Sequence, residues 1–228
     1  MRKSILLLLL IGTAGLGAAS SHMGGWAVVT VDDLPDYVVA DQPIKLSFVV
    51  RQHGMRPVDG LEPALDAKLG SSTISVKAQA QMSGFAESGR YVATLNLPRA
   101  GDWTVTIHSG FGAESATILP LRAVEAGAVP RALSDVERGR RLFIAKGCFT
   151  CHVNTEVTTA RSVSVGPELT GRRYPAAALA KFLANPDSIQ LTQLPRSAWV
   201  KMPNLGLKER EIASLVAMIN TGREVSAR

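Results

Sequence analysis

The sequence predicts a two-domain chain, with an all-β antiparallel sandwich first and an all-α unit after it. Three observations support this fold class. Short β-branched runs, separated by Gly, Pro, Asp and Ser, fill residues 24–122. Apolar residues at helical spacing fill residues 133–225. Between them, residues 123–132 are small, contain Pro130 and read as a linker. A length of 228 residues suits two modest domains.

The first twenty residues have the pattern of a secretory signal peptide. Met1-Arg2-Lys3 is basic, an apolar stretch follows, and small residues stand at Gly17 to Ser20. The apolar stretch is short for a membrane span, so cleavage is favoured over an uncleaved anchor. We therefore expect an exported protein, periplasmic or otherwise extracytoplasmic.

The first half is expected to form several short strands. The expected strands are Trp26–Val31, Ile44–Val50, Ser72–Lys77, Tyr91–Leu95, Trp103–Ile107 and Ala116–Leu119. Gly89-Arg90-Tyr91, followed by Pro98 to Trp103, resembles the YtkA-like and FixH-like immunoglobulin-type sandwiches. This resemblance implies the fold of residues 24–122 and nothing about their chemistry.

One stretch of the first half contains side chains that suit copper. His53 and Met55 lie close together, and His108 and Met82 are possible helpers. Their spacings match no ligand pattern, so a turn with a structural histidine is the favoured interpretation.

The second half is expected to form three helices and the loops between them. Ser134 and Glu137 have the spacing of a capping box, which predicts a helix from Val136 to Lys146 that ends at Gly147. The other two expected helices are Tyr174–Ala184 and Lys208–Asn220.

The most specific motif is Cys148-Phe149-Thr150-Cys151-His152, which contains the only two cysteines. Cys-x-x-Cys-His is typical of covalent haem attachment. On a helical turn, both thiols and the imidazole point to one face, where they can reach the porphyrin and its iron. The motif therefore predicts one covalently bound haem c, with His152 as an iron ligand.

Rival interpretations of this motif fit less well. A thioredoxin-like dithiol expects a βαβ setting and needs no histidine. A structural zinc site needs four ligands, usually from two Cys-x-x-Cys pairs. A simple disulfide across so short a loop would be strained, and His152 would then be coincidental.

About 95 residues resemble the class I c-type cytochromes. The resemblance rests on an ordered set of features: a helix, the Cys148–His152 motif, Gly166-Pro167-x-Leu169, Met202-Pro203 and a closing helix. It implies thioether bonds at Cys148 and Cys151, His152 as proximal ligand, Pro167 as hydrogen-bond partner of His152, and Met202 as distal ligand.

The same resemblance suggests further contacts. Gly139 and Phe143 match the crossing of the first and last helices. Trp199, Tyr174, Arg172 and Arg173 are candidates to bind the haem propionates, because arginine binds carboxylates through two nitrogens.

Charge is spread unevenly along the chain. Residues 21–125 carry 8 Lys and Arg against 11 Asp and Glu, whereas residues 126–228 carry 15 against 8. The basic second half could steer docking onto an acidic redox partner or could simply be a solvated surface. Export and scattered arginines argue against nucleic-acid binding.

Together these features predict a non-enzymatic electron carrier with one haem c. A six-coordinate iron has no open site for chemistry. The expected partners are a terminal oxidase, a quinol-oxidising complex or a periplasmic dehydrogenase, with membrane association possible through an uncleaved N-terminus or a membrane complex. The alternatives are a haem sensor or enzyme that binds a small ligand, and a haem subunit that the sandwich docks into a larger redox complex.

Overall fold

The computed structural model describes residues 24–81, 89–160, 162–188 and 201–221. The predicted signal peptide lies outside these residues. No helix within the described ranges is long and apolar enough to cross a membrane.

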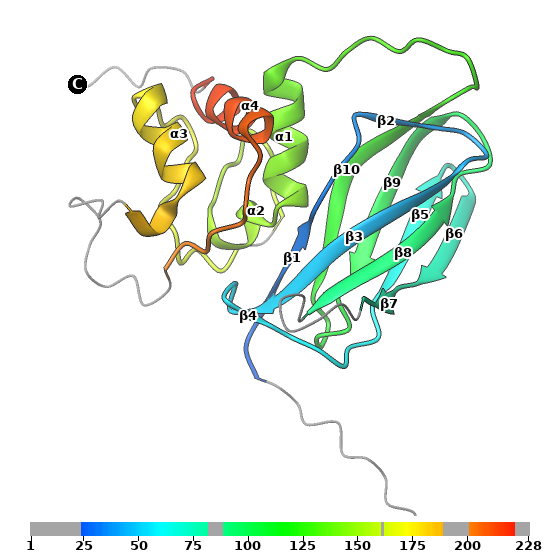
Figure 1. Cartoon of the computed structure of the whole chain (residues 1–228), viewed down its shortest axis with the longest axis horizontal. Helices are drawn as coiled ribbons and strands as arrows, with labels where there is room; N and C mark the ends of the chain where they lie inside the picture. Colours follow the sequence, from blue (N-terminus) through cyan, green and yellow to red (C-terminus); the bar gives the residue numbers. More distant parts are fainter. Residues whose placement is uncertain (1–23, 82–88, 161, 189–200, 222–228) are drawn as a thin grey trace, which may run out of the picture.

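Two five-stranded sheets face each other in the first half of the chain (Figure 1). The first has the order β1 (Ala27–Val31), β3 (Pro43–Gln52), β8 (Arg90–Asn96) and β7 (Gln79–Ala80), with β4 (Arg56–Pro57) beside β3. The second has the order β2 (Tyr37–Val39), β10 (Ser115–Val124), β9 (Gly101–His108), β5 (Ala64–Leu69) and β6 (Ser72–Lys77). Each of the six expected strands overlaps one of these.

The space between the sheets is filled by alternate side chains. Leu46, Phe48 and Val50 point inward from β3, and Trp103 and Ile107 point inward from β9, because successive strand residues face opposite sides. All five of these side chains are fully buried. Every pairing between strands is antiparallel except that of β2 with β10.

The second half contains α1 (Asp135–Ala145), the one-turn α2 (Cys148–Cys151), α3 (Ala176–Ala184), the 3₁₀ turn η1 (Pro186–Ser188) and α4 (Glu209–Ile219). The three expected helices overlap α1, α3 and α4. The predicted capping box is present: the Ser134 hydroxyl accepts from Glu137 N, and the Glu137 carboxylate accepts from Ser134 N at 2.8 Å.

The crossing of α1 and α4 lies at Gly139. A Cβ atom there would be 2.2 Å from the carbonyl oxygen of Ser214 and 2.5 Å from Cβ of Met218. The absence of a side chain therefore lets the two helices approach closely, and Phe143 is buried in the same region.

The helices pack directly on the sandwich. All five residues of β1 are buried, although a strand at the edge of a sandwich normally exposes one face. Val29 faces the sandwich core, while Val28 and Thr30 are covered by the helical side, where the Thr30 hydroxyl bonds to the carbonyl of Lys146 at 3.4 Å. In Figure 1, α1 lies alongside β1 and β10.

The predicted fold class must therefore be corrected. Strands account for most of the regular structure, and the described helices do not form a separate all-α domain of the cytochrome c type. Buried residues of α1 and α4, such as Leu142 and Leu215, belong to the same apolar cluster as the sandwich core. Helix α1 buries part of its surface against β1 and β10, so the helical segment does not pack on itself alone. The boundaries at 24–122, 123–132 and 133–225 stay predictions.

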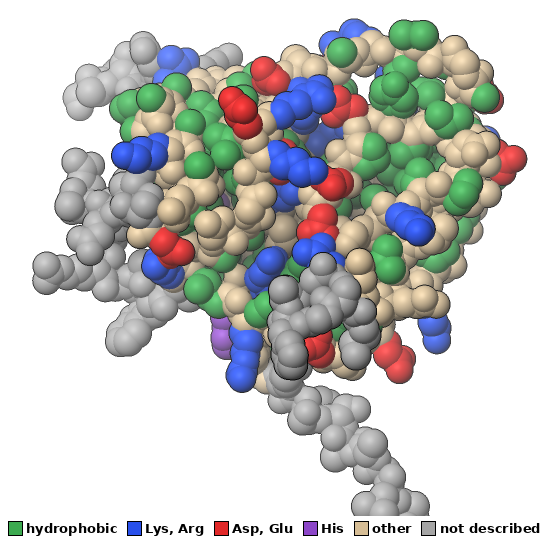
Figure 2. Space-filling model, viewed as in Figure 1, with side chains coloured by type: hydrophobic (Ala, Val, Ile, Leu, Met, Phe, Trp, Pro, Cys, Tyr) green, Lys and Arg blue, Asp and Glu red, His purple; other side chains and the backbone are tan. Residues whose placement is uncertain are grey.

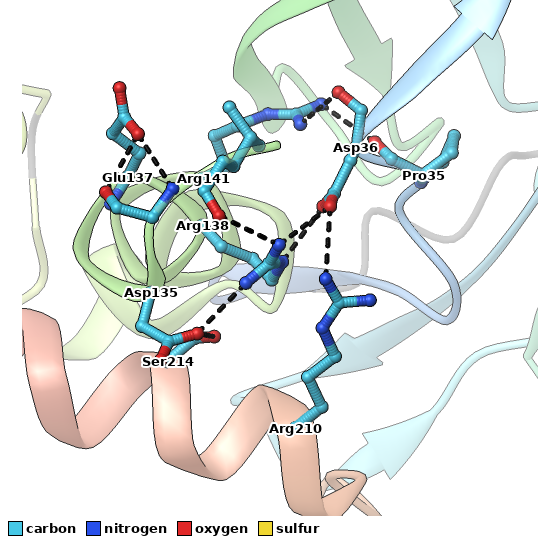
Figure 3. A network of polar contacts seen from close by, with 10 residues as sticks. Pro35, Asp36, Asp135, Glu137, Arg138, Arg141, Arg210 and Ser214 are labelled. Carbon is cyan, nitrogen blue, oxygen red and sulfur yellow. Dashed lines mark hydrogen bonds and ion pairs between the residues drawn. The ribbon is translucent and has the colours of Figure 1, made fainter. Parts of the chain in front are cut away.

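Charged side chains join the helices to the sandwich at their rim. Arg141 donates to the carbonyls of Asp36 and Pro35 at 2.8 and 3.0 Å, and Arg138 binds the Asp36 carboxylate (Figure 3). Figure 2 shows acidic and basic side chains side by side in the band between the two parts.

Candidate functional site

The Cys148–His152 loop begins where α1 ends against β1. Gly147 has a φ of +75°, a conformation that glycine adopts readily, and this lets the chain turn from α1 into α2. A Cβ atom at Gly147 would lie 2.3 Å from Cγ1 of Val28 and 2.7 Å from the carbonyl oxygen of Val29. The loop therefore rests directly on the backbone of β1.

Cys148 and Cys151 stand at the two ends of α2, and both are half-buried. Burial raises the pKa of the Cys148 thiol to about 12, with a smaller effect from nearby Cys151. Burial also raises the pKa of Cys151 to about 11. Both sulfurs are therefore protonated at neutral pH, and neither is an activated nucleophile.

His152 follows α2 and is held by the Gly166–Leu169 segment. Its Nδ1 lies 2.9 Å from the carbonyl oxygen of Pro167. Because a carbonyl can only accept, Nδ1 carries the hydrogen. Burial lowers the pKa of His152, and the Pro167 hydrogen bond opposes that change. The ring is thus neutral, with the lone pair on Nε2 available to a ligand.

Backbone contacts keep this imidazole in place. Gly166 N donates to the carbonyl of Cys151 at 2.9 Å, and Leu169 N donates to the carbonyl of Val153 at 2.8 Å. A Cβ atom at Gly166 would lie 2.4 Å from Cε1 of His152. The His152 ring therefore packs against the backbone of Gly166, where an added side chain would collide with it.

The other predicted site residues are placed less closely. Met202 lies in the loop before α4, is half-buried and packs against the shared apolar cluster. Arg172 is exposed, and its backbone N donates to the carbonyl of Leu169 at 3.1 Å. Tyr174 and Asn220 exchange backbone-to-side-chain hydrogen bonds at 2.8 and 3.0 Å. Trp199 lies outside the described residues.

The histidines of the sandwich have structural contacts. The His53 ring meets Trp26 edge-on at a centroid distance of 5.6 Å. Nε2 of His108 lies 3.0 Å from a carboxylate oxygen of Asp66. Met82 lies outside the described residues. Among the described side chains, no group of three or more His, Cys, Asp or Glu could hold a metal ion.

The sequence analysis did not identify the polar groups that hold the candidate site in position. Lys146 and Glu211 form an ion pair at 2.8 Å, with side chains only 4% and 12% exposed. Asp36 and Arg138 are 102 residues apart in the chain. No local pattern reports such pairs. The usable signal was the three Arg of α1, followed by Lys146 directly before the cysteine loop.

Comparison with known proteins identifies no family for this chain. No family model matches the chain, and no curated protein matches it. Among solved structures, a superoxide reductase (neelaredoxin) from Ignicoccus hospitalis is 18% identical, with a TM-score of 0.30. The match covers 42% of this chain and 80% of that one. A TM-score this low does not establish a shared fold.

These findings correct the family and the cofactor predicted from the sequence. Membership of the class I c-type cytochromes is not supported, because no family model matches and the described helices form no cytochrome domain. One covalently bound haem c is likewise not supported, because no metal-holding cluster is found among the described His, Cys, Asp and Glu.

The predicted function needs the same correction. Neither a mono-haem electron carrier nor the haem-based alternatives has support in the comparisons, and the expected absence of enzymatic activity has none either. The reason for the error is specific: the whole functional prediction followed from one five-residue motif and from a fold that the helical segment does not form alone.

Proposed function

We propose that His152 and Met202 bind a redox-active metal centre, with Pro167 orienting the imidazole and with Cys148 and Cys151 beside the site. The observation that supports this most directly is the hydrogen bond from Nδ1 of His152 to the Pro167 carbonyl, at 2.9 Å. Metal-bound histidines almost always donate their other ring hydrogen to such a partner, which fixes the tautomer and the ring orientation.

The donor atoms set the class of metal. An imidazole nitrogen and a thioether are borderline and soft donors, which suit iron and copper better than magnesium or calcium. Both metals change oxidation state under physiological conditions.

Met202 has a definite part in this proposal. Because no described cluster of His, Cys, Asp and Glu could hold a metal ion, His152 needs a partner donor of another kind. Met202 supplies a neutral thioether from a loop that already packs on the shared core. A thioether stabilises the reduced form of a metal and so raises its potential.

The cysteines are not placed to bind the centre together with His152. Their raised pKa values keep them protonated and inert toward exchange.

The cellular setting is part of the same proposal. The signal-like first twenty residues support export, and the basic second half supports docking with an acidic redox protein. Arg172, exposed close to the His152 segment, is a candidate for that docking surface. Trp199 stays a predicted contact.

Metal analysis of the purified full-length chain tests the proposal. We expect about one iron or copper per wild-type chain, and a loss of most of that metal in His152→Gln. His108→Gln is the matched control, because it makes the same change at an exposed histidine that contacts Asp66. Met202→Leu should weaken metal binding and lower the reduction potential of the metal that remains bound.

Two outcomes would overturn the proposal. One is a wild-type protein without metal. The other is an equal metal content in His152→Gln and His108→Gln. Intact-mass measurement of the wild type distinguishes the simplest rival, because a Cys148–Cys151 disulfide reduces the chain mass by two hydrogens.

A further inference from the structure

Lys146 lies at the junction of the helices, the sandwich and the candidate site. It is the C-cap of α1 and stands two residues before Cys148. The residue is only 3% exposed. Its Nζ contacts a carboxylate oxygen of Glu211 at 2.8 Å and donates to the carbonyl of Asp32, at the end of β1.

The backbone of Lys146 is attached to the same strand. The Thr30 hydroxyl of β1 donates to the Lys146 carbonyl at 3.4 Å. Lys146 therefore meets β1 through both its side chain and its backbone, immediately before the chain turns at Gly147 into the Cys148 loop.

Glu211 connects this point to the other loop of the site. One of its carboxylate oxygens pairs with Lys146, while the other accepts from the backbone N of Lys208 at 2.9 Å. This second bond fixes the first turn of α4. Met202 lies in the segment that leads into α4, so the same carboxylate fixes the point where that segment ends and α4 begins.

We propose that Lys146 and Glu211 are positioning residues that set the distance between the Cys148–His152 loop and the Met202 loop. This inference rests on the proposed function, in which those two loops bind the same centre. The pair is buried and also hydrogen-bonded to backbone, so it holds one geometry. An exposed ion pair would allow its two side chains to adopt many relative positions.

The sandwich has a definite role in this arrangement. The Asp32 carbonyl accepts a hydrogen bond from the Lys146 side chain, and the Thr30 hydroxyl donates one to the Lys146 carbonyl. These two bonds fix the position of Lys146 on the sandwich. Strand β1 therefore supports the candidate site as well as forming part of the first sheet.

The chain offers a matched control. Lys208 pairs with Asp33 across the same boundary between helices and sandwich, but both side chains are exposed, at 66% and 72%. Lys208→Met removes the same charge as Lys146→Met and keeps the backbone N that Glu211 accepts from. Only the buried pair should affect the site.

Added imidazole measures the positioning directly, because it competes with Met202 for the centre. In the metal-loaded full-length protein, Lys146→Met should bind imidazole at about tenfold lower concentration than wild type, since a misplaced thioether competes less well. Glu211→Gln, which keeps hydrogen-bonding capacity, should show a smaller shift in the same direction. Lys208→Met should match wild type. Equal imidazole binding by Lys146→Met and wild type would overturn the inference.

Amide hydrogen exchange separates this inference from the proposed function. It needs no metal, so it still reports if the wild type proves to be metal-free. Lys146→Met should raise exchange in residues 147–152 and 202–208 together, while β9 stays protected and Lys208→Met changes neither segment. Faster exchange over the whole chain, or in only one of the two segments, would contradict a positioning role.

Discussion

Arg138 grips the carboxylate of Asp36 with two nitrogens, at 3.0 Å from Nε to Oδ1 and 2.8 Å from Nη2 to Oδ2 (Figure 3). The Arg138 side chain is only 10% exposed. Asp36 belongs to the loop between β1 and β2, and Arg138 belongs to α1. This fork is therefore a direct link between the sandwich and the helix that leads to the candidate site.

Removal of the Asp36 charge should weaken this link. We expect Asp36→Asn to lower the free energy of unfolding by about 2 kcal/mol, because a largely buried guanidinium loses one of its two ionic partners and keeps only Asp135. Asp33→Asn is the control. Its exposed pair with Lys208 should contribute less than about 1 kcal/mol. Urea unfolding measures both free energies. Equal losses would show that the buried Arg138–Asp36 pair contributes no more to stability than the exposed Lys208–Asp33 pair.

The same carboxylate should make stability depend on pH. The Arg138 hydrogen bond lowers the pKa of Asp36, burial opposes this, and the charges of Arg138, Arg210 and Arg141 lower it further. A lowered folded-state pKa gives stability that is present above the unfolded pKa, about 4, and is lost as pH falls below it.

Comparison of wild type with Asp36→Asn isolates this contribution. Asp66, Asp102 and Glu137 also have lowered pKa values, but they titrate in both proteins. The stability difference between the two proteins should be constant from about pH 5 to 7 and should shrink as pH falls below about 4. A difference that grew toward acid would have the wrong sign for this mechanism.

A side chain at the helix crossing should be poorly tolerated. Gly139→Ala places a Cβ atom 2.2 Å from the Ser214 carbonyl oxygen, so α1 and α4 must separate. We expect a loss of about 2 kcal/mol in unfolding free energy, although alanine favours helix by itself. Gly24→Ala, which meets no atom within 4 Å, should have little effect. A stabilised Gly139→Ala would show that the helices can separate without cost.

Gly166→Ala tests whether the Gly166–Leu169 segment holds the His152 imidazole in position. The new Cβ atom would lie 2.4 Å from Cε1 of His152, so the ring must move away from the Pro167 carbonyl. Metal affinity should fall by about 10- to 100-fold, the usual cost of losing a partner of a metal-bound histidine. Global stability should change less than the affinity does. An unchanged affinity would mean that His152 is not held by this segment.

Local signals predicted the elements better than their assembly. Strand runs such as Trp103–Ile107 and the capping box at Ser134 depend on neighbours in the chain, so the sequence contains their full description. The burial of β1 on both faces depends on α1, more than 100 residues away, and no period along the strand reports it.

The candidate site shows the same division. Cys148, Cys151 and His152 are visible because they are adjacent in the chain. The Lys146–Glu211 pair and the Arg138–Asp36 fork were invisible because each joins distant segments, and a charged residue within a helix ordinarily faces water. The motif alone could therefore not say that the sandwich supports the site.

A redox titration of the full-length protein tests the central claim most directly. Wild type and His108→Gln should show the same reversible one-electron transition, and His152→Gln should lose it because Nε2 no longer binds the centre. A transition that persists unchanged in His152→Gln, or a wild type with no transition, would contradict the assignment of a redox-active metal centre to the Cys148–His152 loop.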